Sequence, residues 1–123
     1  MAFELSEHKN YAQAPIRSIK DAEIDVILKI TRDLKHKNQN RVEDFPAFTA
    51  ALRQNCRLWV ALAADVANSQ NALSADVRAK IFYLCEFTQV QTRRVLSEGL
   101  TAEALIEINV SILRGLSKVR GLE

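Results

Sequence analysis

The fold of this protein is decided by residues 55–95, NCRLWVALAADVANSQNALSADVRAKIFYLCEFTQVQTRRV. Apolar side chains recur at spacings of three and four on both sides of the polar loop 68–74, which predicts two helices with one apolar face each. Because the loop is short, we expect these helices to be antiparallel neighbours. The predicted faces are Phe48, Leu52, Cys56, Trp59, Leu62, Ala63 and Val66 before the loop, and Val77, Ile81, Leu84, Cys85, Thr88 and Val95 after it.

A further helix is predicted on each side of this pair. Their apolar faces are Ile24, Ile27, Leu28, Thr31 and Leu34, and Leu105, Ile108, Ile112 and Leu116. Residues suited to helix ends bound the four segments: Ser18, Asp44, Ser74 and Thr101 as N-caps and Gly99 as a C-terminal stop. The sequence therefore predicts an all-α, compact bundle of four helices, at about 18–37, 45–67, 75–97 and 102–117.

Composition indicates a small globular domain. The 123 residues are 48% apolar, with only 3 Gly and 2 Pro, so we expect one helical domain over 18–123 and a weakly structured tail over 1–17. The chain has no run of 18 apolar residues, so we expect no membrane span. The N-terminus does not resemble a signal peptide. We expect a cytoplasmic protein, with Cys56 and Cys85 reduced and packed as small hydrophobic residues.

No set of residues predicts an active site. His8 and His36 have no Cys or His at metal-ligand spacing, and the chain has no glycine-rich phosphate loop or nucleophile elbow. We therefore expect no enzymatic activity, catalytic residue, cofactor or metal. Asp65 is interpreted as a partly exposed ion-pair or cap residue facing Arg57 or Arg78, in preference to a catalytic role, and Asn71 as a turn residue.

The large side chains of the middle helices allow two interpretations. Trp59 is either a core residue with a partner for its indole N–H or a half-exposed anchor for a partner; we favour the core. The run 81–87 holds too many large apolar residues for one narrow face. Either its helix is central in the bundle, which we favour, or part of its surface binds a partner; the two interpretations are compatible in different parts of the helix. The predicted core comprises Leu52, Trp59, Leu62, Val66, Ile81, Leu84, Ile108 and Ile112.

The order and spacing of several short elements resemble the FlaF family of bacterial flagellar biosynthesis regulators. They are Asn55-x-Arg57-Leu58-Trp59, Leu62-Ala63-Ala64-Asp65, Asn71-x-Leu73, Leu84-x-x-Phe87 and Ile106-x-Ile108-Asn109, with Tyr11-Ala12 and segment 18–23 as weaker N-terminal matches. The resemblance covers nearly the whole chain. Two positions depart from the family pattern: Ser74 stands where a Pro is expected, and Cys56 where a charged residue is usual.

The resemblance implies a protein that binds flagellin, promotes its production or export, and acts opposite an FlbT-type repressor of flagellin expression. A helical bundle could bind an amphipathic flagellin helix in a groove. We expect that groove to lie between the third and fourth helices. Whether the protein forms a homo-oligomer is left open. The candidate partner-binding residues are Phe82, Tyr83, Phe87 and Ile106, with Arg57 and Asp65.

The alternative is an RNA-linked, post-transcriptional regulator of flagellin expression. Its phosphate contacts would come from basic side chains: Arg53, Arg57, Arg93, Arg94 and the tail 118–120. A net charge of +2 argues against nucleic-acid binding and favours the interpretation of these side chains as solvated helix surfaces.

Overall fold

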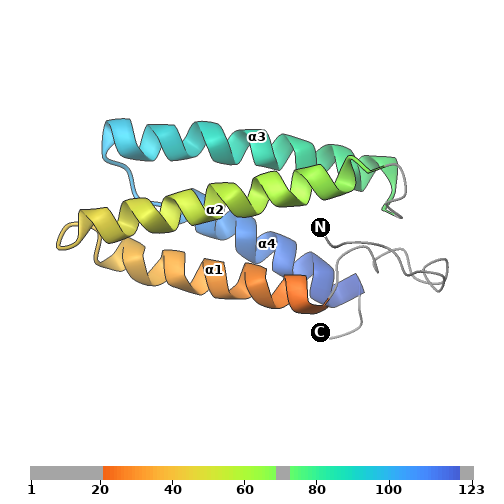
Figure 1. Ribbon diagram of the computed structural model, residues 1–123, viewed down its shortest axis with the longest axis horizontal. Coiled ribbons are helices and arrows are strands. Elements are labelled where there is room, and N and C mark those ends of the chain that lie inside the picture. Colours follow the sequence, from red (N-terminus) through yellow and green to blue (C-terminus); the bar gives the residue numbers. More distant parts are fainter. Residues whose placement is uncertain (1–20, 69–72, 120–123) are drawn as a thin grey trace.

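The computed structural model describes residues 21–68 and 73–119, with side chains described over 23–68 and 73–115. These residues form four α-helices and no strand: α1 (Asp21–Gln39), α2 (Phe45–Val66), α3 (Ala75–Glu98) and α4 (Glu103–Val119) (Figure 1). The all-α prediction is confirmed, and the helix ends lie within three residues of the predicted ones. Ser18, Asn71 and the predicted tail lie outside the described residues.

The helix ends are set by the residues that the sequence pointed to. Asp44 accepts a hydrogen bond from the backbone N–H of Ala47 at 3.2 Å, and Ser74 accepts one from Val77 at 3.2 Å. Each satisfies an N–H that has no partner within its own helix. Gly99 ends α3 with φ 70°, a left-handed conformation that glycine adopts without steric cost. α4 continues past Gly115 to Val119.

The middle of the bundle is α2, which packs against α1 on one side and α3 on the other (Figure 1). α4 packs mainly against α1 and has a smaller contact with α3. The interpretation of the third helix as central is therefore wrong, because α3 is covered chiefly along its side toward α2. Val77, assigned to the apolar face of that helix, is 43% exposed in its first turn.

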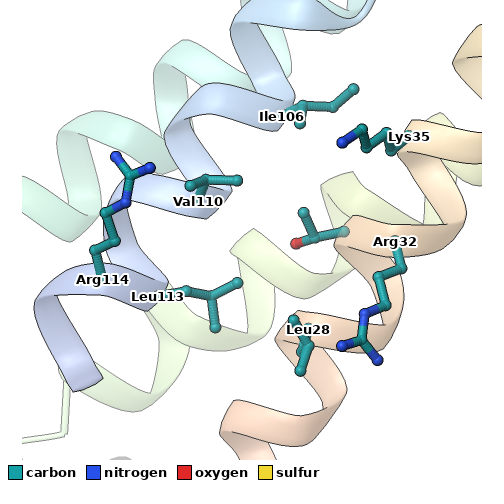
Figure 2. Close-up of a pocket in the computed structure, with 8 residues that line it drawn as sticks. Leu28, Arg32, Lys35, Ile106, Val110, Leu113 and Arg114 are labelled. Carbon is teal, nitrogen blue, oxygen red and sulfur yellow. The ribbon is translucent and has the colours of Figure 1, made fainter. Parts of the chain in front are cut away.

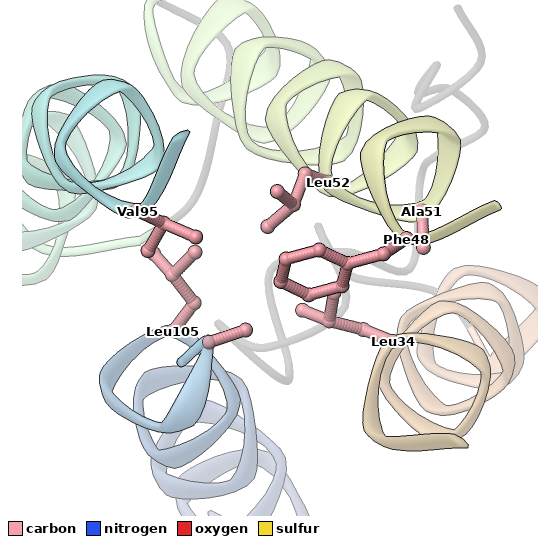
Figure 3. Packing of buried hydrophobic residues seen from close by; sticks show 7 residues of the cluster. Leu34, Phe48, Ala51, Leu52, Val95 and Leu105 are labelled. Carbon is pink, nitrogen blue, oxygen red and sulfur yellow. The ribbon is translucent and has the colours of Figure 1, made fainter. Parts of the chain in front are cut away.

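Two apolar clusters fill the interior. One centres on Trp59 and includes Ile27, Leu62, Val66 and Ile81. The other lies toward the opposite end of the bundle and is built from residues of all four helices, with Ala102 just before α4: Leu34, Phe48, Ala51, Leu52, Val95, Ala102 and Leu105 (Figure 3). Asn38 Oδ1 accepts a hydrogen bond from the backbone N–H of Ala102 at 2.9 Å, and this bond joins the start of α4 to the end of α1.

Within residues 21–68 and 73–119, no helix combines the length and the apolar character that crossing a membrane would require.

Candidate functional site

The outer side of α3 exposes several large apolar side chains. Five of the nine large apolar residues that are exposed in the described chain lie on this helix. Four of them fall within one broad side of the helix, turned away from the buried Thr88 and Val95. We call this surface the exposed α3 face and define it by Phe82, Tyr83, Val90 and Leu96.

The predicted partner-binding residues are divided between two places. Phe82 and Tyr83 belong to the exposed α3 face, with exposed fractions of 43% and 67%. Phe87 is half-buried one turn after Tyr83, at the edge of that face. Ile106 instead lines a pocket between α1 and α4. The structure therefore does not bring all four side chains to a common groove between α3 and α4.

The pocket that includes Ile106 is largely apolar and has a volume of about 360 Å³. Leu28 lies on its α1 side, and Ile106, Val110 and Leu113 lie on its α4 side (Figure 2). Thr31 also lines the pocket, together with three basic residues, Arg32, Lys35 and Arg114. The pocket is therefore a surface, distinct from the exposed α3 face, at which apolar side chains lie together.

A buried hydrogen-bond network joins α1, α2 and α4 around Trp59. The indole N–H of Trp59 donates to Asn109 Oδ1 at 2.9 Å. Asn109 Nδ2 donates to Asn55 Oδ1 at 2.7 Å and to Thr31 Oγ1 at 3.1 Å. The Thr31 hydroxyl in turn donates to the carbonyl of Ile27 at 2.7 Å. The network gives Trp59 the indole partner that burial requires, and it places this residue in the core.

Sequence reasoning did not assign Asn55 and Asn109 a role in the core. Both are 0% exposed. The available signal was an asparagine at an apolar position of an otherwise amphipathic helix, since Asn55 adjoins the predicted face of α2 and Asn109 that of α4. A buried amide must find partners, so such a position indicates a polar network between helices.

Five residues of the predicted structural core are buried, and the other three are half-buried. Leu52, Trp59, Leu62, Val66 and Ile81 are at most 6% exposed. The remaining three residues are half-buried and pack against the Trp59 cluster: Leu84, Ile108 and Ile112.

The exposure of Asp65 differs from the one expected from the sequence. It is only 8% exposed, whereas a partly exposed position was expected. The reason is that Asp65 adjoins the buried Val66 in the last turn of α2, on the side that faces the bundle. Arg57 is exposed, and no ion pair joins it to another described residue.

Arg94, one of the candidate phosphate-binding residues, already has an anionic partner. Its Nε and Nη2 donate to the two carboxylate oxygens of Glu98, each at 3.2 Å. This pair raises the pKa of the Arg94 guanidinium above its usual value, chiefly through the hydrogen bonds. In this structure the charged guanidinium is directed at Glu98.

The two cysteines are free thiols at the contact between α2 and α3, and both are half-buried. Cys56 Sγ donates to Thr92 Oγ1 at 3.3 Å, and Gln89 donates to the Cys56 carbonyl at 3.4 Å. Burial raises the pKa of the Cys85 thiol; a hydrogen bond with Gln89 opposes this effect, whereas Cys56 and Glu86 nearby add to it. Among the residues that the structure describes, no group of three His, Cys, Asp or Glu side chains could hold a metal ion.

Comparison with known proteins identifies the family. Neither the curated proteins nor the solved structures gave a match. A family model described as flagellar protein FlaF matches residues 6–116, which includes the exposed α3 face, the pocket and the network around Trp59. The chain therefore belongs to the FlaF family of flagellar proteins.

Proposed function

We propose that this protein binds flagellin and promotes its production or export. The observation that carries the proposal is the exposed α3 face in a chain that belongs to a flagellar protein family. Large apolar side chains that are exposed together on one face of a protein can mark a site of protein–protein interaction. Aromatic residues are also enriched among those that supply most of the energy of protein–protein interfaces.

An amphipathic helix is the partner element that suits this surface. Tyr83, Phe87 and Val90 follow one another at spacings of four and three, so they form a stripe along α3. Phe82 and Leu96 lie on the other side of the exposed surface, with the charged Glu86 and Arg93 between the two groups. A flagellin helix could bury its apolar seam along this stripe while its polar side chains meet the two charges.

A titration of purified, unassembled flagellin into the full chain, followed by calorimetry, tests the proposal. We expect Phe82→Glu and Tyr83→Glu each to weaken binding at least about tenfold, because each places a charge in an apolar contact. Both residues are exposed, so the melting temperature should change little.

Val26→Glu is the matched control, because Val26 is an apolar residue of α1 with a similar exposed fraction, 48%. The control should bind flagellin like the unmodified protein. No binding by the unmodified protein, or equal weakening by all three substitutions, would reject the proposal. Added salt should change the affinity little, whereas a contact with the flagellin transcript would weaken steeply.

A further inference from the structure

We propose that the pocket between α1 and α4 binds an acidic amphipathic helix of a partner protein. This site is separate from the exposed α3 face, and the inference does not depend on flagellin being the partner there. It is carried by two properties of the pocket: an apolar interior and a rim with charges of one sign.

The interior of the pocket offers almost no polar contact to a ligand. Leu28 on α1 and Ile106, Val110 and Leu113 on α4 supply apolar walls (Figure 2). Thr31 is the only uncharged polar residue in the lining, and its hydroxyl is already used, because it donates to the Ile27 carbonyl and accepts from Asn109. Binding in the interior must therefore come from burying apolar groups.

The rim of the pocket is entirely basic. Arg32 and Lys35 lie on α1 and Arg114 lies on α4, and no carboxylate lines the pocket. Lys35 extends across the opening toward Ile106 (Figure 2). Within the described chain, none of these three cations forms an ion pair, in contrast to the pairs Lys37–Asp33 and Arg94–Glu98. The charge of the rim therefore favours a ligand with carboxylates around an apolar centre.

The length of the pocket's lining suits a helix as the occupant. Its lining spans residues 28–35 of α1 and 106–114 of α4. At 1.5 Å per residue, this length accommodates about two turns of a third helix lying along the groove. Two or three apolar residues at helical spacing would enter the pocket, and acidic residues on either side of them would meet the basic rim.

Other classes of macromolecule fit less well. The pocket has no aromatic side chain on which a nucleic-acid base could stack. Anionic membranes are bound by clusters of about four to eight basic residues, and the rim supplies only three. The protein as a whole has a net charge of only +2. An acidic polypeptide is the class for which both the walls and the rim are suited.

A displayed library of random 18-residue helical peptides, selected on the full chain, provides the test. Peptides are kept if they bind the unmodified protein and fail to bind Val110→Trp, which fills the pocket without changing its charge. If Val110→Trp does not fold, Leu28→Trp fills the pocket from the opposite wall. We expect the retained peptides to be amphipathic and acidic, although the selection itself applies no pressure on charge.

Charge reversal at the rim then tests the electrostatic part. Arg32→Glu, Lys35→Glu and Arg114→Glu together should weaken a retained peptide at least about tenfold, and added salt should weaken it too. The control combines Arg53→Glu, Arg57→Glu and Lys80→Glu, which changes the net charge equally, involves exposed residues and lies outside the pocket. This control and Phe82→Glu should leave the affinity unchanged.

The proposal is overturned if no peptide distinguishes the filled pocket, if the retained peptides carry no net negative charge, or if the two triple variants bind equally. Other occupants are tested with a photo-crosslinking amino acid in place of Val110, and the products are mapped by mass spectrometry. A cross-link to an added retained peptide supports the proposal. A cross-link to residues 1–20 of the same chain, or to a second copy of the chain, overturns it in favour of that occupant.

Discussion

Trp59 and Asn109 are 50 residues apart in the sequence, yet a 2.9 Å hydrogen bond from the indole N–H to the amide oxygen joins α2 to α4 in the core. The same amide donates to Asn55 and Thr31, so one side chain satisfies groups from two other helices. Four helices could pack around an apolar core in several registers. Because a buried donor and a buried acceptor must pair with each other, they restrict the packing to one of these registers.

Asn109→Ala should strongly destabilise the protein. It removes three hydrogen bonds and leaves the indole N–H of Trp59 buried without a partner, which costs about 1–3 kcal/mol for each unsatisfied group. Urea unfolding of Asn109→Ala, Trp59→Phe and the double variant measures the coupling. We expect the double variant to be less destabilised than the sum of the single variants. Strict additivity would show that the bond contributes nothing.

Trp59→Ala should lower the free energy of unfolding by about 3–5 kcal/mol, because Trp59 is 1% exposed and packs against residues of α1, α3 and α4. Flagellin binding should be lost only as the protein unfolds, so binding measured well below the melting temperature should persist. A Trp59→Ala protein that keeps its melting temperature and loses binding would instead identify Trp59 as an interface residue.

Two buried threonines should respond in opposite ways to replacement by valine. Thr88 is 0% exposed, and its hydroxyl has no hydrogen-bond partner among the described residues. Thr88→Val removes that unsatisfied group and should raise the free energy of unfolding by about 1 kcal/mol. Thr31→Val deletes a hydroxyl with two partners and should lower it by a similar amount or more. Thermal or urea unfolding measures both, and a loss of stability in Thr88→Val would contradict the assignment.

The glycines Gly99 and Gly115 form a second matched pair. An alanine Cβ would meet open space at either position, so only the backbone conformation distinguishes them. Gly99 has φ 70°, and Gly99→Ala should lower the free energy of unfolding by about 1 kcal/mol or more. Gly115 lies inside α4, where Gly115→Ala should raise it by about 0.5–1 kcal/mol. Equal effects in an unfolding experiment would show that the left-handed cap is not required.

The Cys85 thiol should make the protein less stable at high pH. Burial raises its pKa in the folded state, so its contribution to stability is fully present below the pKa of the unfolded chain and is lost as the pH rises through the folded pKa. The reference value is 9.0, so the loss should occur above about pH 9. Unfolding under reducing conditions at pH 7.5 and 10 should show a smaller decrease for Cys85→Ala. The same decrease in both proteins would exclude Cys85 as the cause.

The sequence by itself determined the helices and most residues of their inward faces, with Val77 as an exception. Helix formation depends on neighbours three and four residues apart and on caps such as Asp44, Ser74 and Gly99, all of which are local. It also supported the family assignment, because the short elements and their spacing are properties of the chain. The family model confirmed that resemblance over residues 6–116.

Only the tertiary structure decided which surfaces are covered. The periodicity of 81–87 allowed a central third helix, but coverage depends on where the other helices lie, and the exposed α3 face follows from α2 being central. The partnership of Trp59 with Asn109 and the pocket between α1 and α4 likewise join residues far apart in sequence. Spacing along one helix predicts which of its side chains share a face. The packing of the helices decides which side chains of another helix contact that face.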